Sequence, residues 1–173
     1  MTARALILIA AGGSAALLGA ALVAQYLFGL APCALCITQR WPHLAAVVIG
    51  GVALGLPWAV WPVIGALAAL GTAGVGAYHA GVELGWWPGP AACSAGPGIS
   101  GVSISDLLDP TVAMAAPVAC SEVAWSFAGI SMAGWNAILS AALAVVWLMA
   151  ARAMLREGAA WGMRGRETAG GPR

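Results

Sequence analysis

The residues best suited to chemistry in this sequence are two cysteines one helical turn apart, Cys33 and Cys36. A cation, Arg40, follows Cys36 by four residues, which places both on one face of a helix that begins near the second cysteine. Two thiols at a CxxC spacing are typical of dithiol–disulfide chemistry, in which the thiolate is the reactive form. The spacing therefore predicts a redox-active cysteine pair with a positive charge beside it.

The sequence around this pair is too apolar for a soluble domain. Of its 173 residues, 62% are hydrophobic and 8% are charged, and its mean hydropathy is +0.92. This composition indicates an integral membrane protein. There is no basic patch of the kind that binds nucleic acid, so we expect the lipid bilayer, and no nucleic acid, as a partner.

Four apolar runs, each close to the ~20 residues that a membrane-spanning helix requires, divide the chain. They predict an all-α membrane protein, a four-helix transmembrane bundle in a single domain over residues 1–157. The expected spans are 5–27, 37–56, 58–78 and 133–151, and the expected disordered tail is 158–173. Close helix contacts are expected at small residues, namely Gly51, Gly55, Gly71, Gly74 and Gly76.

The arginines predict how the helices are oriented. Arg4 precedes the first span, and five more arginines follow the fourth: Arg152, Arg156, Arg164, Arg166 and Arg173. By the positive-inside rule, both termini are cytoplasmic. The connections 28–36 and 81–132 then face the opposite, oxidising compartment, and all four cysteines of the chain lie in them.

A second, wider pair of cysteines lies in the long outer connection. Cys93 and Cys120 have 26 residues between them, which suits a loop disulfide better than a zinc knuckle, although a four-cysteine zinc site stays open as an alternative. Two disulfides on one face suggest a relay in which a soluble dithiol reduces the loop disulfide and the loop thiols reduce the CxxC pair. Because the chain has no haem or flavin motif, a membrane quinone fits as the electron sink.

Three residues are candidates for the site where electrons leave the chain. Cys36 is expected at the start of the second helix, where free N–H groups and Arg40 favour its thiolate, so we expect a low pKa for this thiol. Arg40 is the only arginine on the outer side, and it would also stabilise negative charge on a reduced quinone oxygen; snorkelling to the headgroups is the alternative. His79 is a candidate proton donor or hydrogen-bond partner for a quinone, with an ordinary interfacial histidine as the alternative.

The run from Cys33 to Arg40, CALCITQR, resembles the CxxC-I-x-x-R motif of the bacterial disulfide-bond formation protein B (DsbB) family. The stretch from Cys120 to Trp135 is similar to the segment that leads into that family's last span. The resemblance implies a protein-dithiol:quinone oxidoreductase of the bacterial inner membrane. Its partners would be a periplasmic, thioredoxin-fold DsbA-type protein, which it reoxidises, and the membrane quinone pool, with ubiquinone rather than menaquinone as the acceptor.

The resemblance also implies a role for each cysteine, in the redox disulfides Cys33–Cys36 and Cys93–Cys120. Cys93 would form the mixed disulfide with the donor, and Cys120 would pass electrons to Cys33. Cys36 would then react with the quinone beside Arg40.

Two further positions of the resemblance bear on proton transfer. His79 falls close to a family histidine near the quinone. Gln39 stands where some members carry a glutamate, so an acid role at this position is not carried over.

Two other classes of protein stay open. In vitamin K epoxide reductase-like enzymes, which are also quinone-coupled and four-helical, the loop cysteines precede the CxxC, whereas here the CxxC comes first. A non-enzymatic membrane scaffold would hold its cysteines as static disulfides or as a zinc clip. The scaffold predicts no thiol turnover and no effect of quinone.

Overall fold

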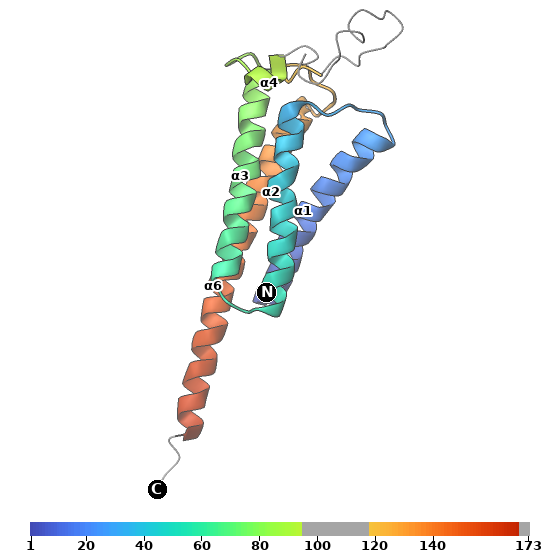
Figure 1. Cartoon of the computed structure of the whole chain (residues 1–173). Helices are drawn as coiled ribbons and strands as arrows, with labels where there is room; N and C mark the ends of the chain where they lie inside the picture. Colours follow the sequence, from blue (N-terminus) through green and yellow to red (C-terminus); the bar gives the residue numbers. More distant parts are fainter. Residues whose placement is uncertain (95–117, 170–173) are drawn as a thin grey trace, which may run out of the picture.

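The computed structural model describes residues 1–94 and 118–169 of the chain, and four long helices dominate this part. These helices are α1 (Ala3–Tyr26), α2 (Ala34–Gly55), α3 (Val60–Glu83) and α6 (Met132–Ala169). Each packs against two neighbours in the ring order α1, α2, α3, α6, and together they form an antiparallel bundle (Figure 1). The predicted all-helical, four-helix membrane fold is confirmed.

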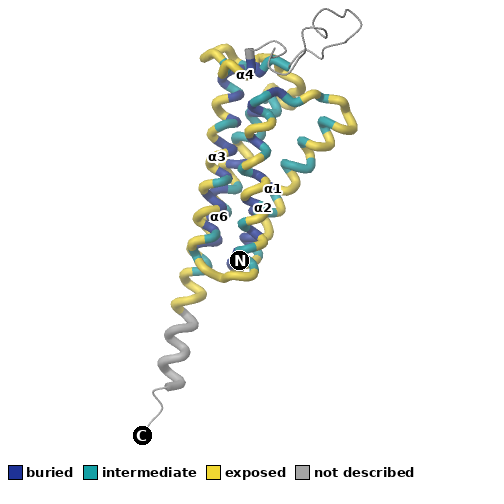
Figure 2. The backbone as a smooth tube through the Cα atoms, in the orientation of Figure 1, coloured by how far each residue is buried: buried dark blue, intermediate teal, exposed yellow. Residues whose placement is uncertain are grey.

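The bundle has the surface of a membrane protein. Three helices are long and apolar enough to span a bilayer: α1, α3 and the Met132–Ala159 part of α6. The fourth, α2, carries Gln39, Arg40 and His43 in its first half, which lowers its hydropathy. Figure 2 shows buried residues along the inner faces of the helices and exposed residues along the outer faces. Large apolar side chains such as Leu8 and Leu67 are exposed there, as lipid contact requires.

Two helices extend further toward the cysteine end of the bundle than the expected spans. α2 begins at Ala34, three residues before the expected span, because the Cys33 side chain caps it by accepting a hydrogen bond from the Cys36 backbone N–H. α3 continues to Glu83 instead of ending at 78. Both His79 and Glu83 therefore lie on the last turns of a helix, with fixed directions toward the interior.

The last helix, α6, is also longer than expected. The sequence suggests a span that ends at 151 and a disordered tail from 158, whereas the backbone is helical to Ala169. Residues 151–160 consist mostly of alanine, arginine, methionine, leucine and glutamate, which are strong helix formers, and no proline occurs between Met132 and Pro172. The helix therefore continues beyond the bundle (Figure 1).

The apolar core near the N-terminus of α1 surrounds Trp147, which is fully buried. Gly65 makes room for this indole, since a Cβ there would lie 2.7 Å from the ring. Gly50 lets α2 approach Ala11 of α1 in the same way. Among the glycines expected at helix contacts, Gly76 lies at one. The prediction is wrong for the other four, Gly51, Gly55, Gly71 and Gly74, since a Cβ at any of them would meet no atom of the described residues within 4 Å.

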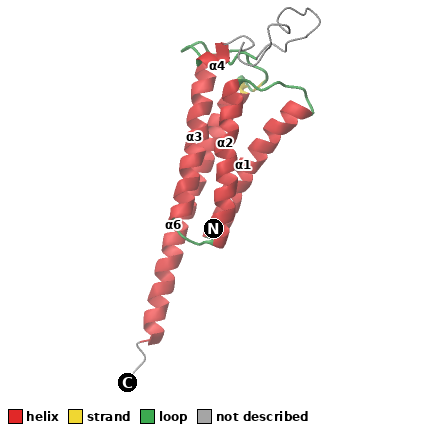
Figure 3. Ribbon diagram, viewed as in Figure 1, coloured by secondary structure: helices red, strands yellow, loops and turns green. Residues whose placement is uncertain are grey.

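The connection between α3 and α6 contains regular structure at both of its described ends. A short helix, α4 (Ala91–Ser94), follows α3, and β1 (Ser126–Phe127) pairs with β2 (Ile130–Ser131) in an antiparallel hairpin. Ala128 and Gly129 at the turn both have positive φ, which matches the right-handed twist of a two-residue hairpin. The Trp135 indole donates to the Phe127 carbonyl at 3.0 Å and holds the hairpin on α6. At the cysteine end of the bundle, α4 contacts α2 and the hairpin contacts α6 (Figure 3).

Candidate active site

The CxxC pair lies at the N-terminus of α2. Cys33 is the N-cap, and its Sγ accepts a hydrogen bond from the backbone N–H of Cys36 at 3.2 Å. The two sulfur atoms lie 3.0 Å apart, and both thiols are free. A disulfide bond is about 2.05 Å long, so a movement of about 1 Å would join them. One turn of helix thus holds the pair ready for oxidation and reduction.

The structure moves the favoured thiolate from Cys36 to Cys33. The expected span begins at 37, after both cysteines, whereas α2 begins at Ala34. Cys33 is therefore the N-cap, and its sulfur lies beside the free N–H groups of the first turn. A hydrogen bond from the Cys36 thiol, with a smaller contribution from His79, lowers the pKa of Cys33 to about 4 although burial opposes this shift. The hydrogen bond with Cys33 and burial raise the pKa of Cys36. The expectation of a low pKa at Cys36 is therefore wrong, because the helix begins earlier than expected.

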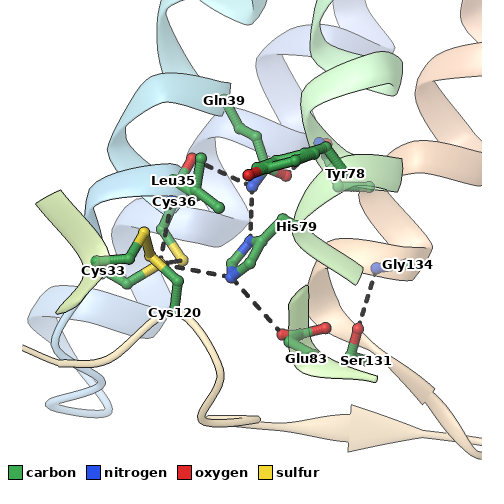
Figure 4. A network of polar contacts seen from close by, with 12 residues as sticks. Cys33, Leu35, Cys36, Gln39, Tyr78, His79, Glu83, Cys120, Ser131 and Gly134 are labelled. Atoms are coloured by element: carbon green, nitrogen blue, oxygen red, sulfur yellow. Dashed lines mark hydrogen bonds and ion pairs between the residues drawn. A yellow bond between two sulfur atoms is a disulfide. The ribbon is translucent and has the colours of Figure 1, made fainter. Parts of the chain in front are cut away.

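The wide cysteine pair is a disulfide, and it lies against the CxxC pair. Cys93, carried by α4, is bonded to Cys120, and their Cα atoms are 5.1 Å apart. The sulfurs of Cys120 and Cys33 and a ring nitrogen of His79 all lie within 4.8 Å of one another, and Figure 4 shows Cys33, Cys36, Cys120 and His79 clustered together. Because Cys93 and Cys120 are bonded to each other, they cannot in this state supply two of the thiolates that a four-cysteine zinc site needs.

His79 lies between the cysteines and α2, buried rather than at an exposed interface, with 3% of its surface exposed. Its Nε2 is 3.5 Å from the Cys33 sulfur and 3.8 Å from a carboxylate oxygen of Glu83. Its Nδ1 is 3.0 Å from the side-chain amide of Gln39 (Figure 4). The imidazole therefore contacts a sulfur of the CxxC pair directly.

Arg40 lies one turn below Cys36 and faces α1. Its guanidinium donates a hydrogen bond to the side-chain carbonyl of Gln25. Its Nε is buried and has no hydrogen-bond partner within residues 1–94 and 118–169, and no carboxylate in those residues forms a salt bridge with it. A half-buried cation without a counter-ion attracts a ligand that carries, or develops, negative charge.

A cavity of about 230 Å³ adjoins the cysteines, between α1 and the other helices. In Figure 1 the second half of α1 leans away from α2, and the cavity lies on this side. Its polar wall includes Cys36, Arg40, His43 and His79, and its apolar wall includes Leu17, Leu18, Ala21, Trp125 and Trp135. Pockets for drug-sized ligands have volumes of about 300–1,000 Å³, so this smaller cavity suits one ring with polar atoms on one side.

The sequence singled out the four cysteines, Arg40 and His79, and the structure gathers all six at one end of the bundle. Sequence reasoning missed Asn136 and the amide of Gln39 as members of the same cluster. Asn136 donates to the Gln39 side-chain oxygen at 2.7 Å. An asparagine inside an apolar span is itself a signal, because a polar side chain at that depth needs a partner on another helix.

A membrane bundle that holds a CxxC pair against a buried loop disulfide defines a class of protein, the membrane thiol oxidoreductases that form disulfide bonds. Comparison with known sequences identifies the family. Residues 3–150 match the family model described as "Disulfide bond formation protein DsbB", and the chain belongs to this family.

The relatives carry the same description. The chain is 35% identical over 140 residues to "Disulfide bond formation protein B" of Verminephrobacter eiseniae (strain EF01-2), which covers 77% of each chain. It is 38% identical over 128 residues to the protein of that name from Methylococcus capsulatus (strain ATCC 33009 / NCIMB 11132 / Bath), with 70% of this chain and 77% of the relative covered. No solved structure matches the chain significantly.

Proposed function

We propose that this protein reoxidises a periplasmic, thioredoxin-fold dithiol oxidase of the DsbA type and passes the electrons through its two cysteine pairs to a membrane quinone. The observation that carries the proposal is the position of the Cys120 sulfur within 4.8 Å of the Cys33 sulfur. Two static disulfides in a scaffold would not need this contact, whereas a relay between the pairs depends on it.

The proposed location is the bacterial inner membrane, with both termini cytoplasmic and the cysteines periplasmic. The arginines at the two ends of the chain support this orientation through the positive-inside rule. The antiparallel bundle is consistent with it, because all four cysteines lie at the end of the bundle away from the N-terminus (Figure 1). The periplasm is an oxidising compartment in which such disulfides persist.

The first exchange takes place at the loop disulfide. A thiolate of the donor attacks Cys93, the Cys93–Cys120 bond breaks, and Cys120 leaves as a thiolate. The second thiol of the donor then attacks the donor's own sulfur in the mixed disulfide. The donor thereby gains a disulfide, and Cys93 is released as a thiolate. Two electrons have passed from the donor to the loop pair.

The second exchange passes these electrons to the oxidised CxxC pair. The Cys120 thiolate attacks Cys33, whose sulfur lies within 4.8 Å of it, and Cys36 leaves as a thiolate. Cys93 then attacks Cys120, re-forming the loop disulfide and releasing Cys33. The loop pair is then oxidised and the CxxC pair reduced, which is the combination that the structure contains.

The residues around the cavity fit a quinone head group. The Nε–H of Arg40 is a buried donor at the polar wall that has no hydrogen-bond partner within residues 1–94 and 118–169, and the apolar wall suits a ring. A bound quinone would supply the sink, because its reduction consumes the two electrons and two protons of the CxxC dithiol. Arg40 would orient a quinone oxygen, and Cys36, which lines the cavity, would lie beside the ring. We propose ubiquinone rather than menaquinone as the acceptor.

The proposal is tested by the loss of quinone absorbance when the purified protein receives a reduced thioredoxin-fold donor and either ubiquinone or menaquinone. We expect turnover with ubiquinone, none in Cys36→Ser, and slower turnover in Arg40→Ala. Arg152→Ala serves as the matched control, since Arg152 is exposed at the opposite end of the bundle.

Each alternative predicts a different result. Absence of turnover with both quinones, while the thiols stay inert, would leave the static scaffold. Turnover that survives Cys36→Ser would contradict the assigned order of the cysteines. Faster turnover with menaquinone would correct the choice of acceptor only.

A further inference from the structure

A chain of four polar side chains crosses the bundle between the two histidines. His79 on α3 contacts Gln39 on α2 at 3.0 Å, Gln39 contacts Asn136 on α6 at 2.7 Å, and Asn136 contacts His43 on α2 at 2.8 Å. His43 and His79 are the only histidines of the protein, and both line the cavity. Once one group in this row of side chains is known to donate or to accept, the role of its neighbour is fixed as well. The ring nitrogen that carries the proton can therefore be assigned for each histidine.

The Gln39 amide is oriented by a backbone carbonyl. Its Nε2 lies 3.2 Å from the carbonyl oxygen of Leu35, and a carbonyl oxygen only accepts, so the NH2 group rather than the oxygen occupies this position. The two amide hydrogens then point to the Leu35 oxygen and to Nδ1 of His79 (Figure 4). Nδ1 of His79 must accept, and the proton of the neutral ring is therefore on Nε2.

The groups at Nε2 of His79 require the same arrangement. This nitrogen faces the Cys33 sulfur at 3.5 Å and a Glu83 carboxylate oxygen at 3.8 Å. A thiolate and a carboxylate are both acceptors, so an N–H at this position can donate to the sulfur, whereas a bare nitrogen would face two acceptors with no hydrogen to share. The two sides of the imidazole thus lead independently to the Nε2–H tautomer.

The Asn136 amide is oriented in turn by Gln39. The Gln39 oxygen only accepts, so the group 2.7 Å away is the NH2 of Asn136. Thr72 agrees with this assignment, because its hydroxyl donates to the backbone carbonyl of Gln39 at 3.1 Å and is left to accept from the Asn136 NH2, also at 3.1 Å. The Asn136 oxygen therefore faces His43 and accepts from its Nε2–H.

We infer that Gln39 and Asn136 are positioning residues that fix both histidines as Nε2–H tautomers, so that His79 presents an N–H to the sulfur of Cys33. This inference deepens the proposed function, on which its role in turnover rests. When Cys93 attacks Cys120 in the Cys33–Cys120 mixed disulfide, the bond to Cys33 breaks and its electron pair stays on Cys33. The His79 N–H then stabilises the leaving thiolate through a hydrogen bond, without transferring its proton.

The tautomers can be measured directly, without donor or quinone. In the full-length protein labelled with 15N-histidine in detergent, the nitrogen shifts and N–H couplings show which ring nitrogens carry a proton. We expect a protonated Nε2 and a bare Nδ1 for both histidines, assigned with His43→Phe. In Gln39→Glu the carboxylate offers only acceptors, so the proton of His79 moves to Nδ1 or the ring becomes doubly protonated. Thr38→Val is the matched control, since Thr38 is exposed and, within the part of the chain that the structure describes, its side chain bonds only a carbonyl of its own helix.

Turnover gives a second readout that a structural role alone would not produce. In Gln39→Met, which fills the same space without a donor, kcat falls about tenfold or more because a hydrogen bond to a charged group is weakened. The KM for the donor stays unchanged, since the donor reacts at the loop disulfide, whereas Gln39 lies further along α2, beyond the CxxC pair. Asn136→Leu is expected to perturb the tautomers of both histidines.

The inference is overturned if wild-type His79 carries its proton on Nδ1, or if Gln39→Glu leaves the His79 spectrum unchanged. Gln39→Met with wild-type kcat would overturn the link to turnover. These outcomes differ from failure of the proposed function, in which no variant oxidises the donor although the tautomers are as expected.

Discussion

The acidity of Cys33 leads to a prediction that separates the two thiols of the CxxC pair. We expect reduced protein to hold one thiolate at Cys33 down to about pH 4, and Cys36→Ala to move this ionisation upward by several pH units. The reason is that the Cys36 thiol makes the largest contribution to lowering the pKa of Cys33. Thiolate absorbance near 240 nm, recorded from pH 3 to 10, would measure the change in a variant that lacks the two loop cysteines.

The expected difference is large. With a pKa of about 4, about 99% of Cys33 is ionised at pH 6. An ordinary thiol with a pKa of about 8.5 is ionised to about 0.3% at this pH. The fraction of thiolate therefore differs by about 300-fold, which is well outside the error of an absorbance titration.

The same shift affects the reduction potential of the pair. The thiolate exists only in the reduced form, so a lowered pKa stabilises the dithiol relative to the disulfide at any pH above about 4. The full advantage is present above about pH 8.5 and is lost as the pH falls through the pKa of Cys33. At pH 7, about three units above the pKa of Cys33, the ionisation stabilises the dithiol form by about 4 kcal/mol. For a two-electron couple this stabilisation raises the reduction potential by up to about 90 mV. The CxxC pair then accepts electrons from the loop pair more readily.

The titration can contradict this reasoning in two ways. A first ionisation of the reduced pair above pH 7 would show that neither the helix N-terminus nor the Cys36 thiol acts as described. An unchanged midpoint in Cys36→Ala would show that the acidity of Cys33 has another source. Cys33→Ala is the matched control, in which the ionisation near pH 4 should disappear because the thiol that carries it is gone.

Three further predictions test the relay and the packing. Cys120→Ser should abolish oxidation of the donor while a chemically reduced CxxC pair still reduces quinone, in single-turnover absorbance measurements; donor oxidation at the wild-type rate would contradict the relay. Trp147→Ala should lower the free energy of unfolding by about 3–5 kcal/mol because it empties the centre of the core, measured by denaturation in detergent. The exposed Trp58 is its control, since Trp58→Ala should change stability by no more than about 0.5 kcal/mol. Gly65→Val should cost about 1–3 kcal/mol by overpacking the indole, whereas Gly71→Val, with no neighbouring atom within 4 Å, should not; equal losses would refute the packing argument.

The sequence by itself determined the properties that depend on neighbouring residues. Runs of apolar residues predicted four membrane-length helices, because a bilayer requires about 20 such residues in a row whatever lies elsewhere in the chain. The CxxC motif and its arginine predicted a redox-active pair and indicated the family for the same reason, since one helical turn sets their spacing. The end of α6 was missed although its signal is local, because alanine and arginine continue a helix beyond the hydrocarbon.

The tertiary structure decided which of these residues meet. Cys120 comes from a connection 87 positions after Cys33 in the chain, yet their sulfurs lie within 4.8 Å. Gln39 meets Asn136 across 97 positions and orients His79. Such contacts depend on how four helices rotate and lean against one another, and on small residues such as Gly65 and Gly76 that set the closest approach. Hydropathy does not determine this rotation, because every helix is apolar on most of its circumference and polar partners are matched only when the bundle closes.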